Sequence, residues 1–492
     1  MSKKIVIIGG GVAGLTAGIY GQKNGYHTEI IEMHNTPGGQ CTAWDRKGYR
    51  FDHCLNWLVG TAKGPFHDVW KETNVITDDT KIIDREVHTK IFDEQGNDFT
   101  IYSSIDRWEK YLIEMSPEDA VPIMKMCNEM RKGSVLEPFR DPPELRKPWD
   151  YLRALKKMMP ALLMVMKYRK LSCGQYFQRL NLKSARLSFF FDTLYAKRNF
   201  SAIAFLMMLV WFHQRNAGYL IGGSLPLANR MAERYMSLGG TLTLGREVAK
   251  IIVEDDAACG VELANGMKVR ADHVISAADG NSTIFKMLEG KYLSKKILEA
   301  YSTWPLFTPL VQVSFGINKE IETRCAFQTY LAKGRKIGST TIATGFTIIN
   351  YSFDPTMAPE GKTVLILRYE SPWKLWKDLE GEAYENEKKC IETDAIVIME
   401  RYHAGIRDNI DVIDIATPKT NIRYTGVWKG AYEGFKPTSN NLGKHLLMTL
   451  PKLRKFTMCG QWLSPGGGLP PSALSGKWAI QMLCKEDKIF FG

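Results

Sequence analysis

The amino-acid sequence predicts an α/β protein in which a parallel sheet carries a mixed α+β unit inserted between its strands. Three observations predict this fold: an apolar run that enters a glycine turn at residue 9, a second glycine-rich turn at residues 465–468, and two long segments of different pattern between them. The 492 residues are 45% hydrophobic and 24% charged, which is ordinary for a globular chain and excludes a disordered or collagen-like protein.

The first element is a strand that leads through glycines into a helix. The apolar residues 5–8 are typical of a buried parallel strand. Gly9 permits a tight turn, Gly11 allows the backbone to approach a pyrophosphate, and Gly14 allows the helix to pack closely on the strand. Together they predict a nucleotide site.

The helix begins at Val12 and Ala13, where its N-terminal amides and partial positive charge suit phosphate groups. A second strand, residues 28–32, ends in Glu32, which lies 18 positions after Gly14. The Glu32 carboxylate can accept hydrogen bonds from both ribose hydroxyls and would repel a 2′-phosphate. The complete unit therefore predicts FAD or NAD rather than NADP.

A second pair of glycines selects FAD between these two. Gly38 and Gly39, followed by Gln40 and then by residues 48–52, resemble the second fingerprint of a flavoprotein superfamily. That superfamily contains the carotenoid desaturases, retinol saturase, the amine oxidases and the Rab GDP-dissociation inhibitors. Its members usually carry an arginine after the two glycines, so Gln40 removes a positive charge near the phosphates or the flavin.

Residues 456–462 and 465–476 resemble the C-terminal FAD motif of the phytoene desaturases, in which a strand ends at a glycine and a glycine-rich turn opens the last helix. The positive end of such a helix suits a reduced flavin ring. Gln461 stands where relatives often have an acidic residue near the ribityl chain, so this contact is neutral here. The resemblance implies FAD contacts at Gly460, Gln461, Gly468, Leu469 and Pro470, and a backbone contact from Val248 to adenine.

The same resemblance implies a Rossmann-like FAD-binding domain that is assembled from three separated pieces of chain, residues 1–70, 216–290 and 445–492. Residues 71–215 read as a mostly helical insert that faces a membrane, and residues 291–444 read as a mixed-sheet substrate domain. We expect these two inserts to bind the substrate and to set its specificity.

The net charge of the chain is concentrated in one block. Lys and Arg number 65 against 53 Asp and Glu, a net charge of +12. Residues 140–198 hold fourteen basic and four acidic residues, a net of +10, so the other 433 residues carry only +2. Residues 152–171 place apolar side chains among lysines, which predicts peripheral contact with an anionic membrane. An ordinary core-facing helix with a solvated basic face is the alternative, and no nucleic acid is expected because no reading motif accompanies the charge.

The apolar run at residues 202–212 is shorter than the roughly 20 residues that a membrane-spanning helix needs, so no transmembrane segment is expected. The run suits either the wall of an apolar tunnel or buried core. No signal segment is expected before the strand that begins near residue 4. Nine scattered cysteines with no Cys-x-x-Cys pattern and no metal spacing predict a cytoplasmic protein without a metal. The basic residues of 152–171 add the expectation that it binds peripherally to a membrane.

The chemistry is predicted from what surrounds the second fingerprint. No second glycine fingerprint follows a strand, so no separate NADPH domain is expected, and the electron donor or acceptor is left open. Residues 51–60 are closer to the saturase-like branch than to ordinary desaturases, and the resemblance implies that Asn56 and Trp57 lie beside the isoalloxazine. His53 is the candidate acid or base, with a pKa expected near neutrality.

We therefore expect an FAD-dependent oxidoreductase that desaturates, saturates or isomerises a C–C bond of a hydrophobic polyene, isoprenoid or fatty lipid. Two alternatives remain. A flavin amine oxidase is disfavoured because the sequence shows no clear aromatic-cage signature. A non-catalytic lipid-chain binder similar to the GDP-dissociation inhibitors would keep the fold without using flavin, whereas the intact fingerprints favour a bound one.

Overall fold

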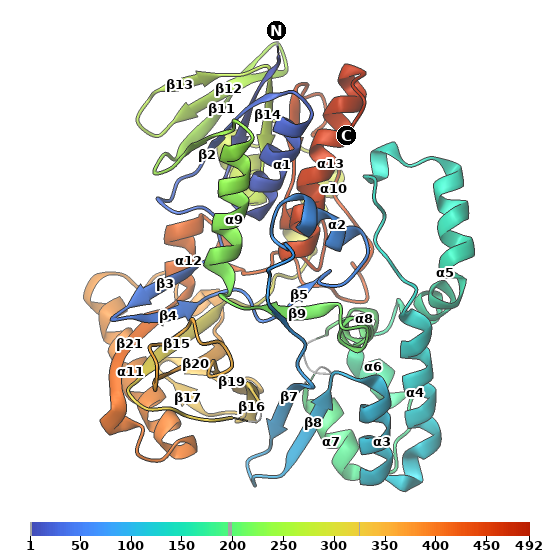
Figure 1. Ribbon diagram of the computed structural model, residues 1–492, viewed down its shortest axis with the longest axis vertical. Coiled ribbons are helices and arrows are strands. Elements are labelled where there is room, and N and C mark those ends of the chain that lie inside the picture. Colours follow the sequence, from blue (N-terminus) through green and yellow to red (C-terminus); the bar gives the residue numbers. More distant parts are fainter. Residues whose placement is uncertain (1, 195–198, 324) are drawn as a thin grey trace.

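The computed structural model describes residues 2–194, 199–323 and 325–492. It shows a parallel sheet, a second and larger sheet below it, and a helical unit beside both (Figure 1). In spatial order the strands of the parallel sheet are β10 (Thr241–Thr243), β2 (His27–Ile31), β1 (Lys4–Ile8), β14 (His273–Ser276) and β22 (Phe456–Met458). All four pairings in this sheet are parallel, which confirms the predicted α/β class.

Three helices cover the parallel sheet: α1 (Val12–Lys23), α9 (Ser224–Ser237) and α13 (Leu469–Asp487). The first and last of these cross closely because Gly476 has no side chain: a Cβ atom there would lie 2.3 Å from the carbonyl oxygen of Ala13. An antiparallel ribbon stands at the top of Figure 1, formed by β11 (Val248–Glu254), β12 (Ala257–Leu263) and β13 (Lys268–Arg270). The chain then forms the π-helical turn η4 (Ser282–Met287) and helix α10 (Lys295–Thr303).

The second sheet has seven strands, in the spatial order β21 (Ile410–Ala416), β15 (Leu310–Ile317), β20 (Thr363–Glu370), β19 (Gly345–Asn350), β16 (Phe327–Leu331), β7 (Val87–Phe92) and β8 (Asp98–Tyr102). Every pairing is antiparallel except that of β16 with β7. Helix α11 (Gly381–Tyr402) packs on it through Ile391, Ile398 and Met399. Because β7 and β8 belong to residues 71–215, the predicted helical insert also supplies an edge of this sheet.

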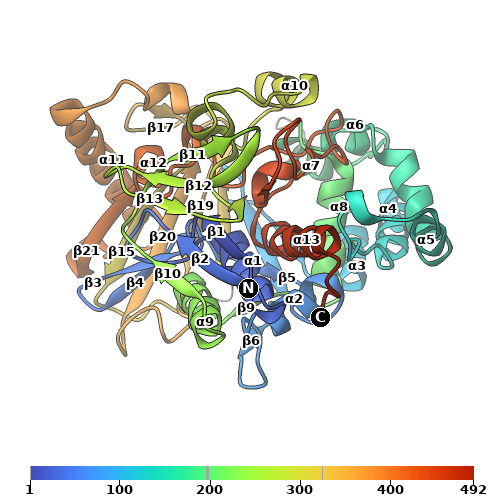
Figure 2. The same cartoon turned by 90° about the horizontal axis from the view of Figure 1, so that it is seen from above.

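The helical unit is formed by α3 (Ile105–Met115), α4 (Ala120–Gly133), α5 (Pro148–Tyr168), α6 (Cys173–Gln178), α7 (Ala185–Leu194) and α8 (Ala202–His213). Seen from above, α5 lies at the outer edge of the molecule, far from both sheets (Figure 2). The sequence predicts a helix over residues 152–171. In the structure this helix is α5, which begins four residues earlier, at Pro148, and ends at Tyr168. A proline is favoured at the first helical position because its missing N–H has no partner there.

Short elements connect these layers. They are the strands β3 (Ala43–Arg46), β4 (Tyr49–Asp52), β5 (Leu58–Val59), β6 (Ile82–Ile83), β9 (Ala217–Leu220), β17 (Lys336–Ile337) and β18 (Thr340–Thr341), the helices α2 (Pro65–Glu72) and α12 (Pro418–Thr425), and the 3-10 turns η1 (Pro117–Asp119), η2 (Pro143–Leu145), η5 (Trp373–Leu375), η6 (Arg407–Asn409), η7 (Trp428–Gly430) and η8 (Gln461–Leu463). Within the described residues, every helix is too short or too polar to span a membrane.

Candidate functional site

One cavity of about 1090 Å³ extends from the carboxyl ends of β1, β2 and β14 to the helices α5 and α8. Its walls at the sheet end come from the first glycine turn, the turn at residues 38–41, the start of β11 and the turn before α13. Ligands of open parallel sheets bind at the carboxyl ends of the strands. The cavity therefore begins where a nucleotide is expected.

The first glycine turn has the geometry that its residues predict. Gly9 has a φ of +97°, a conformation that side chains disfavour. A Cβ atom on Gly14 would lie only 1.9 Å from the carbonyl oxygen of Gly9, so the strand and helix can approach only without that side chain. Gly11 caps α1 without any side-chain hydrogen bond, which leaves the first amides of the helix to a ligand.

Glu32 lies at the end of β2 and lines the cavity. Its Oε2 accepts a hydrogen bond from the Gly10 amide at 2.6 Å, and its Oε1 accepts one from the His34 amide at 2.8 Å. Burial raises the pKa of Glu32, and these amides oppose the rise. The carboxylate is thus fixed in place with capacity left for ribose hydroxyls.

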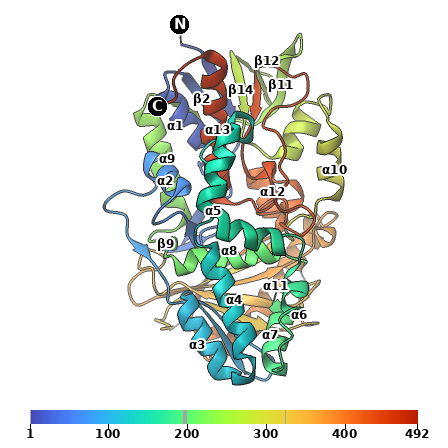
Figure 3. The ribbon, with the colours of Figure 1, turned by 90° about the vertical axis from the view of Figure 1, so that its right-hand side faces the viewer.

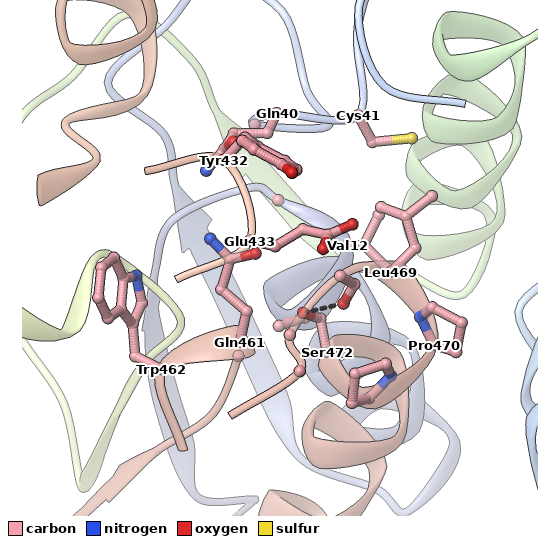
Figure 4. A pocket seen from close by; sticks show the side chains of 18 of the residues that line it. Val12, Gln40, Cys41, Tyr432, Glu433, Gln461, Trp462, Leu469, Pro470 and Ser472 are labelled. Carbon is pink, nitrogen blue, oxygen red and sulfur yellow. Dashed lines mark hydrogen bonds between the residues drawn. The ribbon is translucent and has the colours of Figure 1, made fainter. Parts of the chain in front are cut away.

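The C-terminal motif closes the cavity from the opposite side. Gly468 caps α13, again without a side-chain hydrogen bond, at a φ of +98°. Gln461, Leu469 and Pro470 surround the same space (Figure 4). The cavity is lined by the predicted cofactor residues Gly9, Gly11, Val12, Ala13, Glu32, Gly38, Gly39, Gln40, Val248, Gly460, Gln461, Gly468, Leu469 and Pro470, whereas Gly14 packs behind it.

These residues fit a dinucleotide. Two uncapped helix N-termini, those of α1 and α13, open onto one cavity, and both suit anionic groups. The turn at residues 38–41 also lines this cavity, and position 38 has no room for a side chain. A Cβ atom on Gly38 would lie 2.4 Å from the carbonyl oxygen of Cys41. Glu32 supplies the acceptor for a ribose.

Beyond this region the cavity wall becomes apolar. Helix α8 lines it with Ile203, Ala204, Met207, Met208 and Trp211, and α5 lines it with Met158, Leu162 and Val165. The opposite side of α8 packs in the helical core through Leu206, Leu209 and Val210. Of the two roles open for residues 202–212, the helix therefore has both, since one side lines the cavity and the other is core.

A buried arginine organises the residues where the two halves meet. Arg368, on β20, donates to Gln312 Oε1 at 2.9 Å, to Asn56 Oδ1 at 3.1 Å, and to the backbone carbonyls of Asp52 and His53 at 2.9 and 3.0 Å. No carboxylate among the described residues pairs with it at ion-pair distance. Its positive charge therefore faces the cavity without a counter-charge in contact.

His53 lies in the cavity wall but does not have the predicted acidity. Burial, and then the nearby charge of Arg368, lower the pKa of His53 to about 4. The expectation of a pKa near neutrality is wrong, because the sequence does not show that the imidazole is enclosed. Its ring packs at 5.8 Å from Trp44 and is neutral at physiological pH.

Asn56 and Trp57 also line the cavity, as expected for residues beside the cofactor. Trp57 packs edge-on against His88 at 5.3 Å and against Phe212 at 5.5 Å. A second arginine, the half-buried Arg85, donates to the backbone carbonyl of Asn56 at 2.9 Å. Asn56 is thus held by two arginines.

Residues 12–382 match the family described as flavin-containing amine oxidoreductases. The chain belongs to this family. It is 22% identical over 489 residues to prolycopene isomerase 1 of an Oncidium hybrid, with 96% of this chain and 82% of that protein covered. It is 23% identical over 518 residues to the lycopene-forming phytoene desaturase of a Paracoccus species, with 99% and 98% covered.

The fold is also found in a solved oxidoreductase of Methanosarcina mazei, with a TM-score of 0.61, 16% identity and coverage of 97% of this chain and 100% of that one. Within the superfamily, the chain lies in the phytoene desaturase-like branch, as predicted from its glycine motifs. The protein is an oxidoreductase, and its cofactor is FAD.

Two residues of this flavoprotein site are missing from the sequence-based predictions. Arg368 directly follows the uncharged run 363–367, and a charge at the end of an apolar strand-like run was an available signal. Glu433 follows Tyr432 on the loop after η7 and lines the cavity. Its signal was weaker: it is the acidic residue in a glycine-flanked stretch, residues 430–434. Burial raises the pKa of Glu433 to about 7.

Proposed function

We propose that this protein is an FAD-dependent oxidoreductase that desaturates, saturates or isomerises a C–C bond of a hydrophobic polyene, isoprenoid or fatty lipid. The observation that carries the proposal is the continuity of one cavity, which runs from the glycine-lined nucleotide end to the apolar wall of α5 and α8. FAD supplies the hydride chemistry when it is bound. The chain supplies binding, orientation and charge.

The apolar wall suits a long, flexible hydrocarbon. Met158, Met207 and Met208 line it, and methionine adapts its shape to irregular ligands. Removal of such a ligand from water stabilises its binding by about 25 cal/mol per Å² of buried apolar surface. The relatives named for prolycopene and phytoene, which are polyenes, support the same substrate class.

Arg368 and Asn56 contribute polarity where the two halves meet. With FAD bound, the guanidinium of Arg368 would stabilise negative charge on the reduced cofactor. The Oδ1 atom of Asn56 is occupied by Arg368, so its Nδ2 group is left to donate a hydrogen bond into the cavity. Both groups are preorganised, because each is fixed by further hydrogen bonds.

We further propose that the outer face of α5 docks on an anionic membrane and collects the lipid there. Five large apolar side chains form an exposed stripe on this helix, here called the α5 stripe: Leu152, Leu155, Met159, Leu163 and Met166. Their spacing of three and four residues places them on one face of a helix. Exposed Arg153, Lys156 and Lys157 lie beside it, and α5 faces outward (Figure 3).

The inner face of the same helix lines the cavity. One helix therefore separates the exposed stripe from the apolar wall, which gives a lipid a short path between them. The alternative is that the basic face of α5 is exposed to solvent and contacts no membrane. The enzyme would then take its lipid substrate from solution.

A flavin amine oxidase is the second candidate, and one observation favours it. The rings of Phe307 and Tyr432 lie 5.2 Å apart and both line the cavity. Such a pair can flank a small cation or amine. The length of the apolar wall favours the lipid.

An anaerobic spectral titration tests the choice. Purified protein reconstituted with FAD is mixed with candidate polyenes or with primary amines, and the flavin bands and the products are recorded. We expect polyene conversion, with bleaching where the net reaction oxidises the lipid. Bleaching by a primary amine together with unchanged polyenes would establish the amine oxidase instead.

A further inference from the structure

Among the carboxylates that lie near the site, three buried ones are held by hydrogen bonds. Asp52 accepts bonds from the amides of Cys54, Leu55 and Ser224 and from the Ser224 hydroxyl. Asp279 accepts bonds from the Ser282 and Trp428 amides at 2.8 and 2.9 Å. Glu32 accepts two amides, as described above. These three carboxylates stabilise the backbone around them.

Glu433 differs from all three. No described residue donates a hydrogen bond to its carboxylate, and its side chain reaches into the pocket beside Gln461 (Figure 4). The side chain is half-buried and lines the cavity, so its carboxyl faces the space that the cofactor would occupy and is not sealed in the protein core. An unpaired carboxyl in the cavity of a redox cofactor has a chemical use available to it.

The loop that carries Glu433 is fixed by two backbone hydrogen bonds directly after that residue. The amide of Phe307 donates to the carbonyl of Gly434 at 3.0 Å, and the amide of Gly466 donates to the carbonyl of Phe435 at 2.9 Å. The backbone of Glu433 itself lies against the C-terminal turn, since a Cβ atom on Gly467 would come within 2.4 Å of the Glu433 carbonyl oxygen. The backbone of Glu433 is therefore fixed, and no described residue neutralises its carboxyl by an ion pair or a hydrogen bond.

That place is the start of α13. A Cβ atom on Gly468, the cap of this helix, would lie 3.7 Å from Oε1 of Glu433. The helix end favours negative charge, and so it attracts both the carboxylate and the charge that the cofactor gains. Two negative charges at one site oppose each other, and one of them is relieved by a proton.

We propose that Glu433 is the proton acceptor of this flavin site: it takes up one proton from solvent when the cofactor gains two electrons, and it releases that proton when the electrons leave. The balance is complete. Transfer of a hydride to the flavin brings two electrons and one proton, and the second proton binds a carboxylate oxygen of Glu433. The proposal needs FAD but no particular substrate, so it is independent of the lipid assignment.

The surroundings of Glu433 agree with this role. Burial alone raises its pKa to about 7, so the carboxyl is close to balance between its two forms at neutral pH. The other ionisable groups that line the same cavity are Glu32, Cys41, His53, Cys54, Glu137, Arg246, Glu247, Asp279, Lys286, Arg368 and Tyr432. None of them is a cause of the raised pKa. Added negative charge on the cofactor is then the event that changes its protonation.

The test is a spectroelectrochemical titration of the FAD-bound protein between pH 6 and pH 9, with infrared spectra of the oxidised and reduced states. Above a pH of about 7, we expect the equilibrium constant for reduction to fall tenfold more per pH unit in the wild type than in E433Q. For two electrons this difference is about 30 mV per pH unit. The wild type also gains a protonated-carboxyl band on reduction, and E433Q does not.

The matched control is E137Q. Glu137 lines the same cavity, but its carboxylate is paired with Lys157 at 2.7 Å. We therefore expect E137Q to show the same pH dependence of reduction and the same protonated-carboxyl band as the wild type. If E433Q fails to bind FAD, E433D is compared with the wild type instead. E433D retains a carboxyl group, so the protonated-carboxyl band should remain but change its frequency. Equal slopes in wild type and E433Q, or a wild-type spectrum without the carboxyl band, overturn the proposal. A failure to convert any polyene would instead affect only the proposed function.

Discussion

Arg368 donates a hydrogen bond to Oδ1 of Asn56 over 3.1 Å, and this bond decides which end of the Asn56 amide faces the cavity. The two residues are 312 positions apart in the chain. The bond joins the segment after the second glycine pair to the middle of the large sheet. It therefore couples the stability of the interface between the two sheets to the polarity of the site.

Removal of Arg368 is expected to destabilise the protein strongly. R368A leaves the oxygens of Gln312, Asn56, Asp52 and His53 without this donor, and an unmet buried acceptor costs about 1–3 kcal/mol. We expect a loss of at least about 3 kcal/mol in the free energy of unfolding. Urea denaturation of R368A and R368K measures it. A loss below about 1 kcal/mol would contradict the role given to this arginine.

His53 is expected to influence stability at acid pH rather than the rate at neutral pH. Its folded pKa of about 4 lies below the ordinary value of 6.5, so the unfolded chain binds the proton first as pH falls. The folded state is therefore fully stable above pH 6.5 and loses stability as pH falls toward 4, by about 3 kcal/mol.

The measurement is the free energy of unfolding of wild type and H53Q at pH 4, 5, 6 and 7. H53Q should lose less stability over this range by about that amount. The pH profile of the enzymatic rate between 6 and 8 should be the same in both proteins. A rate transition near pH 6.5 that disappears in H53Q would restore the acid or base role.

Two glycines of the first turn are expected to fail in different ways. G14A brings a Cβ atom to 1.9 Å from the Gly9 carbonyl, so we expect it not to fold, or to fold with FAD excluded. G11A brings its Cβ no closer than 3.8 Å to the Gly38 carbonyl, so it should fold and bind FAD at least tenfold more weakly. Circular dichroism and FAD titration compare them. If G14A and G11A gave the same circular dichroism spectrum and the same FAD affinity, the separate roles given to Gly14 in packing and to Gly11 in cofactor binding would be wrong.

The nucleotide half of the site could be predicted from the sequence because its signals are local. Gly9, Gly14 and Glu32 lie within one strand–helix–strand unit, and each acts through backbone geometry that the residue type determines. The same holds for Gly468, which opens the last helix. Short sequence separation makes such patterns readable.

The chemical properties of the residues beyond the nucleotide half could not be predicted, because these properties arise from distant pairings. The pKa of His53 depends on its burial and on Arg368, which lies 315 positions away. The Glu433 carboxylate is unpaired because none of the described elements around it donates a hydrogen bond to it, and this depends on how those elements pack. Strands β7 and β8 lie in a segment that reads as helical, and β7 pairs with β16, some 240 positions later in the chain. No local pattern contains this information.

The apolar wall is expected to limit the substrate and not the cofactor. Ala204 lines the cavity on α8 among larger side chains, so A204F adds volume where a lipid chain would lie. We expect the rate with a long polyene to fall at least tenfold while FAD absorbance is unchanged. A383F, at an exposed position of α11 that does not line the cavity, is the control. An unaffected rate in A204F would mean that the lipid does not pass α8.

Membrane docking through α5 is expected to require both its charges and its stripe. A variant with glutamine at Lys156, Lys157, Lys167, Arg169 and Lys170 should bind anionic vesicles at least a hundredfold more weakly, because each basic residue contributes about 1 kcal/mol near such a surface. The loss is smaller than five full contributions, since Lys157 and Lys167 are paired with Glu137 and Glu129.

The control replaces five exposed lysines elsewhere by glutamine: Lys295, Lys296, Lys333, Lys336 and Lys377. It changes the net charge equally, so it separates a local contact from a general electrostatic attraction. A third variant, with serine at Leu152, Leu163 and Met166, removes the exposed stripe and keeps the charge. Co-sedimentation with anionic and neutral vesicles compares all three. Equal binding of the two glutamine variants would show that net charge alone attracts the protein, whereas loss in the α5 and serine variants together places the bilayer on this helix.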